Sequence, residues 1–257
     1  MDPHAVLAAF DEQIRRRPSA GDRHVEQTEN VIRIVSSWWA GVVWSRLDPG
    51  NADTVIAAEI ERFTALDREW EWKHYSYDKP DDLPDRLRRA GFAPEPTEAL
   101  MVAETAELAL DVPPSPGVQL TPVVDRDGVS QLVAVHDEVF GGDHSAMGQE
   151  MLTDLRRDPE AGAAVVAMAG DTPVAGGRVE FHHGAEFASL WGGGTIADWR
   201  GRGVFRSLVA HRAALAAARG FRYLHVDASA ASQPILHRLG FVDIAATTPY
   251  LCPGTAG

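Results

Sequence analysis

The chain has 257 residues, of which 45% are apolar, and its net charge is −13. This length suffices for one large domain or two small ones, each with a buried core. The excess of negative charge repels polyanions, so we expect no nucleic-acid partner. No run approaches the roughly 20 apolar residues that span a bilayer, and the N-terminus lacks the build of a signal peptide, so we expect a cytoplasmic protein without a membrane partner.

Metal and disulfide chemistry find little support in the sequence. The single cysteine, Cys252, lies close to the C-terminal end, which excludes an internal disulfide and a cysteine-ligated cluster. The histidines are adjacent, as in His182-His183, or widely scattered, and neither spacing suits zinc. We therefore expect no metal. We expect His182-His183 to lie in a solvated hairpin turn and Asp143-His144 to lie in a loop.

The first part of the chain predicts a helix followed by strands. Ala5 to Arg17 has an amphipathic pattern, and Asn30 to Leu47 contains strand-like segments with three tryptophans, Trp38, Trp39 and Trp44. Tryptophans in such segments more often belong to a core or an interface than to a ligand cage.

The chain also matches itself at an offset of 149 residues. Val55 to Phe92 and Val204 to Phe241 each run through a helix, an aromatic-rich strand, a polar turn with proline, a short helix and Gly-Phe. A further strand is expected after each Gly-Phe, at Ala99 to Val102 and at Thr248 to Leu251. The matched spacing of four elements predicts two related halves.

A proline-rich stretch, Val112 to Gly117, separates these halves and predicts a stiff, extended linker. We accordingly expect two domains, residues 1–112 and residues 117–257. The elements expected beyond the linker are a strand at Val118 to Pro122, a helix at Asp127 to Phe140, strands at Ala163 to Ala169 and Pro173 to Phe181 joined by a turn at Gly170-Asp171, and a strand at Glu186 to Ile196.

A basic, glycine-punctuated turn follows the last of these strands and opens a helix. Gly201 and Gly203 allow close approach of the backbone to a ligand, and the unpaired amides of a helix start attract anions. Arg200, Arg202 and Arg206 add guanidinium groups, which suit phosphate oxygens. The alternative is a basic surface turn with no ligand. No Gly-Lys-Ser/Thr follows, and no dinucleotide fingerprint is present, so a nucleoside triphosphate is a poor expectation.

The helix after the turn has apolar residues at helical spacing until Gly220, and the strand Phe221 to Val226 and the short helix Pro234 to Leu239 follow. This order of strand, phosphate turn, helix, strand and short helix resembles the GNAT acyltransferase superfamily. The family's phosphate motif is Gln or Arg, two residues, Gly, one residue, then Gly or Ala. Here it reads Arg200, Gly203 and Phe205, so that phenylalanine in the last slot departs from the family.

The resemblance implies an α/β (α+β) fold with two tandem GNAT-like domains, each a mixed, mostly antiparallel sheet flanked by helices. It also implies acetyl-coenzyme A as co-substrate, no metal, and acetyl transfer to a primary amine of a small molecule or a peptide. Gly192-Gly193-Gly194 indicates a bulge or a close approach of the backbone, where we expect an amide to face the thioester carbonyl; the alternative is a flexible glycine-rich loop. The cofactor-binding residues that the resemblance implies are Gly194, Thr195, Ile196, Arg200, Gly201, Arg202, Gly203, Val204, Phe205, Arg206, Ser229 and Ser232.

The usual catalytic positions of the family are changed. The slot of the glutamate base holds Ser189, and the slot of the tyrosine acid holds Leu236. Glu180 and Asp227 are the catalytic candidates, since each ends a strand near the expected cleft, although either carboxylate can instead be structural. The altered slots also leave open a sensor that binds acetyl-coenzyme A without turnover, and a purely structural pair of domains.

The first half lacks the phosphate turn. Asn51-Ala52-Asp53-Thr54 stands opposite the basic turn and has neither glycine nor positive charge. We expect a degenerate GNAT-like domain that binds no pyrophosphate and serves packing, formation of a homodimer, or one wall of the acceptor pocket.

Overall fold

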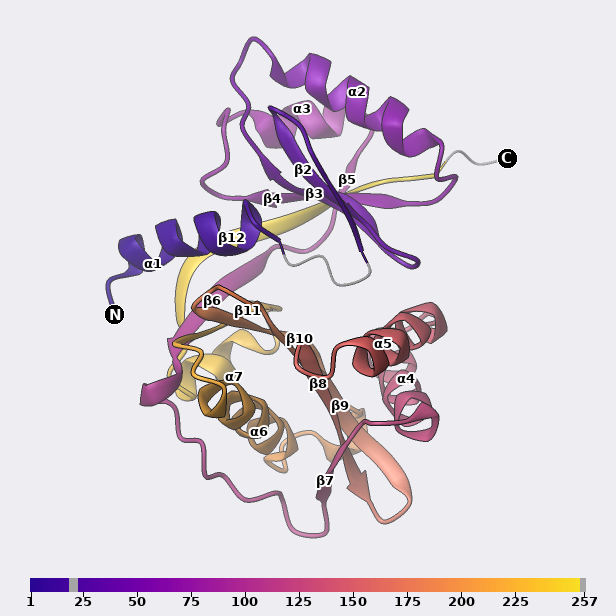
Figure 1. Ribbon diagram of the computed structural model, residues 1–257, viewed down its shortest axis with the longest axis vertical. Helices are drawn as coiled ribbons and strands as arrows, with labels where there is room; N and C mark the ends of the chain where they lie inside the picture. Colours follow the sequence, from indigo (N-terminus) through magenta and orange to yellow (C-terminus); the bar gives the residue numbers. More distant parts are fainter. Residues whose placement is uncertain (19–22, 255–257) are drawn as a thin grey trace. The chain divides into compact units, whose positions relative to one another are not determined.

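The computed structural model describes residues 1–18 and 23–254, which form two compact units (Figure 1). The N-terminal unit comprises Asp2–Leu100, Asp227–Ala230 and Asp243–Gly257, and the C-terminal unit comprises Met1, Met101–Val226 and Ala231–Val242. Each half of the sequence therefore supplies most of one unit, and the end of the chain adds a strand to the N-terminal unit. The expected division into residues 1–112 and 117–257 describes the sequence and stays a prediction.

The N-terminal unit has a mixed sheet with the strand order β1-β2-β3-β4-β12. Its strands are β1 (His24–Gln27), β2 (Val31–Val35), β3 (Ala40–Ser45), β4 (Trp70–Tyr75), β12 (Val242–Cys252) and the two-residue β5 (Ala93–Pro94), which pairs with β12. The β3/β4 pair is parallel and the others are antiparallel. β12 is longer than the strand predicted at Thr248 to Leu251.

Three helices belong to this unit: α1 (Pro3–Phe10), which continues as a π-helical turn at Asp11–Arg15, α2 (Ala52–Thr64) and α3 (Leu83–Arg89). The core joins α2 and α3 to the sheet, with Phe63 stacked on Trp70 at 4.1 Å between ring centroids. Trp44 is buried, as the sequence predicts for a core residue, whereas Trp38 is 41% exposed.

The C-terminal unit has the strand order β11-β10-β9-β8-β7, in which β10 and β11 are parallel and the other neighbours antiparallel. These strands are β7 (Gln119–Pro122), β8 (Gly162–Ala169), β9 (Thr172–Phe181), β10 (Phe187–Thr195) and β11 (Tyr223–Ala228), and the strand β6 (Glu98–Glu104) leads the chain into the unit. All of them were expected from the sequence, with ends shifted by a few residues.

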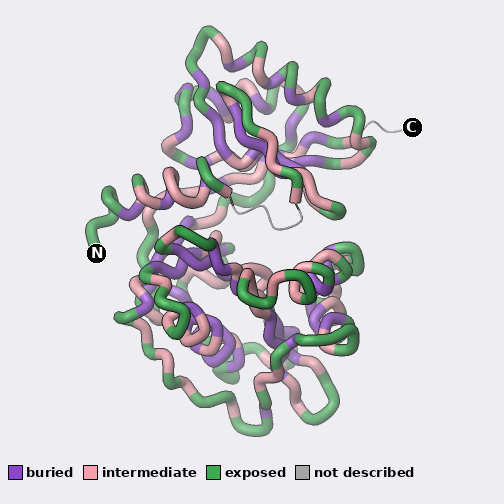
Figure 2. Tube along the Cα trace, in the orientation of Figure 1, coloured by how far each residue is buried: buried purple, intermediate pink, exposed green. Residues whose placement is uncertain are grey.

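The helices of this unit are α4 (Arg126–Phe140), α5 (Ser145–Arg157), α6 (Val204–Ala218) and α7 (Gln233–Arg238). α4 and α6 lie on opposite sides of β9, because a Cβ on Gly176 would meet Leu132 of α4 and a Cβ on Gly177 would meet Arg212 of α6 (Figure 1). The buried residues concentrate along the strands and on the inner faces of these helices (Figure 2). The sequence did not predict α5.

The repeat predicted from the sequence has a structural counterpart at each Gly-Phe. Gly91 and Gly240 both have positive φ, 99° and 101°. In each copy the amide of the following phenylalanine donates to a leucine carbonyl five residues back, Phe92 to Leu87 and Phe241 to Leu236, each at 3.0 Å. Both short helices therefore end in the same way, with a left-handed glycine that lets the chain turn into the next strand.

Two features are absent from residues 1–18 and 23–254. No helix there combines the length and the apolar composition needed to cross a membrane. The same ranges hold no group of three or more histidine, cysteine, aspartate or glutamate side chains that could hold a metal ion.

Candidate functional site

The strands β10 and β11 part within the C-terminal unit. Their parallel register runs from Phe187 opposite Tyr223 to Ser189 opposite His225, while β10 continues to Thr195 and β11 to Ala228. Beyond Ser189, the two strands are therefore no longer hydrogen-bonded to each other, and their facing backbone edges are open to another partner.

A bulge made of glycines lies in β10 just beyond this point. The register with β9 is regular up to Trp191 and resumes at Gly194, with the irregularity between them. Gly192 has φ of 56°, and a Cβ there would lie 2.7 Å from His136 of α4. A Cβ on Gly193 would lie 3.0 Å from Arg212 of α6. The predicted bulge is confirmed, and only glycine fits between these two side chains.

Both side chains hold the bulge through its carbonyls. His136 Nε2 lies 2.9 Å from the Gly192 carbonyl oxygen. Burial, and then the charge of Arg178, lower the pKa of His136 to about 4, so the ring is neutral near pH 7 and donates from Nε2. The buried Arg212 guanidinium donates through Nη1 to the carbonyls of Arg178, at 3.1 Å, and Trp191, at 3.4 Å, and burial lowers its pKa to about 9.

The turn before α6 has the geometry that the sequence predicts. Gly201 and Gly203 have φ of 73° and 83°, and Gly203 directly precedes the first helical residue, Val204. No side chain caps this helix start, and its first turn holds no acidic residue. Arg200, Arg202 and Arg206 are exposed around it. The positive end of the helix dipole and three guanidinium groups thus face solvent together.

Three contacts hold the turn in place. Arg200 Nε donates to the Thr195 carbonyl at 3.0 Å, and the Arg202 guanidinium lies 4.7 Å from the Trp199 ring centre. The Ser115 hydroxyl, from the linker, donates to the Arg202 carbonyl at 2.7 Å. This role of Ser115 was not predicted, because the contact joins residues far apart in the chain.

The structure brings most of the predicted cofactor-binding residues to the end of β10 and the start of α6. Gly194, Thr195 and Ile196 are buried at the end of the strand. The Phe205 ring lies beside the bulge, 3.3 Å from the position of a Cβ on Gly193, on the side of α6. Ser229 and Ser232 lie farther on, between β11 and α7, and their role stays a prediction.

One face of the C-terminal sheet carries polar side chains next to the parting strands. Glu180 and Ser189 are direct partners in the β9/β10 ladder, so their side chains share a face. The Ser189 hydroxyl lies within hydrogen-bond distance of Nε2 of both His182 and His225. Ser189 is fully buried, and His182 and His225 are 8% and 3% exposed.

The prediction that His182-His183 forms a solvated turn is wrong for its first residue. His182 continues the alternation of β9, which turns it to the same face as Glu180 and toward Ser189. Only His183 is exposed, with 65% of its side chain accessible, and its Nε2 lies 3.6 Å from Asp158. His144 directly precedes α5, and its Nδ1 lies 2.9 Å from an oxygen of Asp137.

Asp227, the second catalytic candidate, belongs to the N-terminal unit, where its carboxylate is paired with the Lys73 ammonium. Burial alone would lower the pKa of Lys73, but the charge of Asp227 raises it. Burial, and then the charge of Asp227, raise the pKa of Glu98 to about 7. The second-half carboxylate is thus part of a charged cluster with residues of the first half, which the sequence did not indicate.

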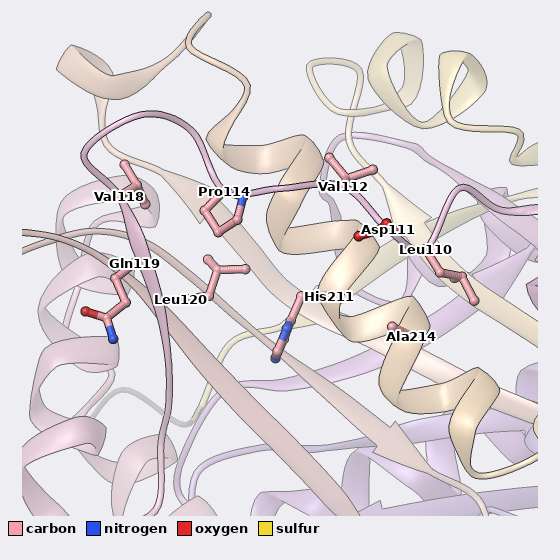
Figure 3. Close-up of a pocket in the computed structure, with 9 residues that line it drawn as sticks. All are labelled: Leu110, Asp111, Val112, Pro114, Val118, Gln119, Leu120, His211 and Ala214. Atoms are coloured by element: carbon pink, nitrogen blue, oxygen red, sulfur yellow. The ribbon is translucent and has the colours of Figure 1, made fainter.

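A pocket of about 590 Å³ lies on the flank of α6, where it is lined by His211 and Ala214 of the helix and by residues in and next to the linker, among them Leu110, Val112 and Pro114 (Figure 3). Burial, and then the charge of Arg212, lower the pKa of His211. None of the predicted site residues lines this pocket, so the candidate site is the open strand edge and basic turn described above.

Comparisons with known proteins agree with this geometry. Residues 130–241 match the sequence model of the family described as "Acetyltransferase (GNAT) family". No curated protein is similar enough to match the chain.

Similar solved structures cover nearly the whole chain. A GCN5-related N-acetyltransferase from Kribbella flavida has a TM-score of 0.71 and 17% identity over 98% of this chain and 95% of its own. A functionally unknown conserved protein from Staphylococcus epidermidis has a TM-score of 0.68 and 14% identity, covering 94% and 98%. A tandem GNAT protein from the clavulanic acid biosynthesis pathway has a TM-score of 0.61 and 12% identity, covering 93% and 86%. At these identities the likeness shows a shared fold.

Proposed function

We propose that the chain transfers an acetyl group from acetyl-coenzyme A to a primary amine, since residues 130–241 match the sequence model of the GNAT family of acetyltransferases. The observation that carries the proposal is the parting of β10 and β11 after Ser189 and His225, next to an uncapped, basic helix start. The open strand edges would pair with the amide-rich pantetheine arm, and the turn would hold the pyrophosphate.

The residues of the turn fit a pyrophosphate. A Cβ would meet nothing within 4 Å at Gly201 and only the Ser115 hydroxyl at Gly203, so there is open space beside both glycines. No side chain caps the first turn of α6, and the amides of such a helix start bind phosphate oxygens. Phe205 fills the slot of a small residue, but its ring is turned toward Gly193 and away from the glycine turn.

The bulge of β10 supplies the second part of the site. When bound, acetyl-coenzyme A supplies a thioester carbonyl that an amine can attack. A bulge leaves an amide outside the strand ladder, and an amide held by rigid neighbours stabilises negative charge on a nearby carbonyl oxygen. His136 and Arg212 give the Gly192–Gly194 segment that rigidity. His136 binds the carbonyl of Gly192 and Arg212 binds the carbonyl of Trp191, from opposite sides of the sheet.

The acceptor is proposed as a primary amine of a small molecule or peptide, and Glu180 and Asp227 remain the carboxylates proposed to act on it. Glu180 shares the polar face with Ser189. Asp227 is paired with Lys73 and belongs to the N-terminal unit. Glu180 is therefore the better supported of the two.

Calorimetric titration with acetyl-coenzyme A tests the proposal. We expect binding by the wild type and a loss of about 100-fold or more in affinity for Arg202→Glu combined with Gly203→Asp, since charge reversal and a carboxylate at the helix start both repel phosphate. The matched control is Arg46→Glu combined with Gly50→Asp in the turn before α2, which should bind normally. Absence of wild-type binding would contradict the proposal.

An amine panel then separates transfer from sensing. Ser189 and Leu236 stand where the family places its base and acid, and Leu236 is buried in α7, so a sensor that binds acetyl-coenzyme A without turnover is the second candidate. Release of free thiol in the presence of primary amines, measured against the double variant, favours the transferase. Tight binding of acetyl-coenzyme A without release of free thiol in the presence of any amine favours the sensor.

A further inference from the structure

His182, Ser189 and His225 form a buried chain of three hydrogen-bonded side chains. Each belongs to a different part of the C-terminal sheet: His182 follows β9, Ser189 lies in β10 and His225 in β11. The serine hydroxyl contacts Nε2 of both imidazole rings. The ring centroids are 6.1 Å apart, and the angle between the ring planes is 21°.

A hydroxyl placed between two imidazole nitrogens fixes the protons of both rings. It has one proton to donate, so one Nε2 must accept from it and the other Nε2 must donate to it. When both rings are neutral, they are therefore held in opposite tautomers. A proton that reaches the outer nitrogen of one ring can then be matched by release of a proton from the outer nitrogen of the other, with both hydrogen bonds reversed.

The position of His182, Ser189 and His225 in the sheet suits proton transfer between the proposed site and the surface. His225 and Ser189 are the last residue pair before β10 and β11 part, so the chain ends at the proposed thioester site. At its other end, His182 adjoins the exposed turn at His183 and Gly184. The charged groups on the same face of β9 are Arg178 and Glu180, and His136 contacts the bulge from α4.

We propose that His182, Ser189 and His225 form a proton relay that replaces the carboxylate base of the transfer reaction, an inference that rests on the proposed function. His225 takes the proton of the acceptor ammonium, Ser189 passes a proton across, and His182 releases one to solvent. The amine nitrogen then bonds to the acetyl carbon, and the carbon–sulfur bond breaks with its electron pair going to sulfur. The nitrogen loses its second proton through solvent to the thiolate, which yields the amide and the free thiol.

The first test needs no substrate. Imidazole nitrogen resonances are followed by NMR between about pH 5 and 9, the range in which histidine titrates. In the wild type, we expect the two rings to titrate as a coupled pair, and in Ser189→Ala each ring should titrate independently. The control is His183→Asn, an exposed neighbour, which should leave the coupling unchanged. Independent titration of both rings in the wild type would overturn the relay.

The second test uses turnover. Ser189→Ala and His225→Gln should lower kcat by about 100-fold, the usual contribution of a general base, with unchanged calorimetric affinity for acetyl-coenzyme A. A purely structural role would instead weaken binding or thermal stability together with kcat. If the wild type is active and Ser189→Ala keeps its full kcat, the relay is wrong and the proposed function stands. If the wild type shows no turnover, the proposed function fails, and the NMR titration still decides whether the protons are shared.

Discussion

The turns before α2 and α6 open the corresponding helices of the two halves. Neither helix start has a side-chain cap, but the two turns differ in the charge that they carry. Before α2, the Asp48 carboxylate accepts from the amides of Gly50, at 2.7 Å, and Asn51, at 3.0 Å. Before α6, Gly203 adopts φ of 83°, and no side chain caps the helix. The first turn carries its own anion, while the second leaves its amides for an anion from solution.

The buried charges follow the same division. In the N-terminal unit, Arg15 and Asp78 form a bidentate pair, and Lys73 pairs with Asp227. In the C-terminal unit, the buried Arg212 donates to three backbone carbonyls. They belong to Leu208 in its own helix, Arg178 in β9 and Trp191 before the bulge. The buried charges of the N-terminal unit thus pair with each other, whereas the buried Arg212 of the C-terminal unit binds the backbone of the proposed site.

The largest effect is expected for Asp78→Asn. Burial alone would lower the pKa of Arg15, but Asp78 raises it. Loss of this carboxylate leaves the buried cation paired with the more exposed Asp11. We expect the free energy of unfolding to fall by about 3 to 5 kcal/mol in a denaturant titration. Asp81→Asn removes an exposed carboxylate that pairs with Lys79 and is the matched control, with little change. Equal effects of the two variants would contradict a structural role for the Arg15–Asp78 pair.

Gly203→Asp gives the α6 turn the carboxylate that the α2 turn already has. We expect affinity for acetyl-coenzyme A to fall by about 10 to 100-fold, or about 1.4 to 2.7 kcal/mol, measured calorimetrically. Gly184→Asp is the matched control, since Gly184 also has positive φ, 79°, in an exposed turn and makes no part of the proposed site. A similar loss of affinity in the control would attribute the effect to backbone strain.

Glu98→Gln tests whether the raised pKa of this carboxylate in the N-terminal unit makes the stability of the fold depend on pH. With a folded pKa of about 7 against an ordinary value of 4.5, the folded state holds more protons than the unfolded state between these values. Wild-type stability therefore falls as pH rises through this window and stays lower above about pH 7. After allowance for partial exposure, the variant should gain about 1 to 2 kcal/mol over the wild type at about pH 8 and little near pH 4. Parallel stability curves for the two proteins between these pH values would contradict the raised pKa.

The smallest effect is expected for Asp48→Ala. Loss of the carboxylate leaves the amides of Gly50 and Asn51 to solvent, which should cost about 1 kcal/mol in unfolding free energy. Affinity for acetyl-coenzyme A should not change. A weaker affinity in this variant would show that the α2 turn also takes part in binding.

The sequence predicted the features that depend on local chemistry. The glycine turn, the bulge and the Gly-Phe helix ends were predicted because glycine is required wherever φ is positive or a neighbour comes close. The helix α5 was missed because its apolar residues Met147, Met151 and Leu152 are sparse, although Pro159 follows it directly and is a stop signal. The contacts of Ser189 with two histidines and of Asp227 with Lys73 join residues far apart in sequence, and only strand pairing brings them together.

Backbone amide NMR during a titration with acetyl-coenzyme A tests the central claim most directly, because both turns report in one experiment. We expect large shifts at Gly201, Gly203 and Val204, and none at Gly50 and Asn51. Shifts confined to the α2 turn, or saturating binding without any shift at Gly203, would contradict the assignment of the phosphate site to the C-terminal unit.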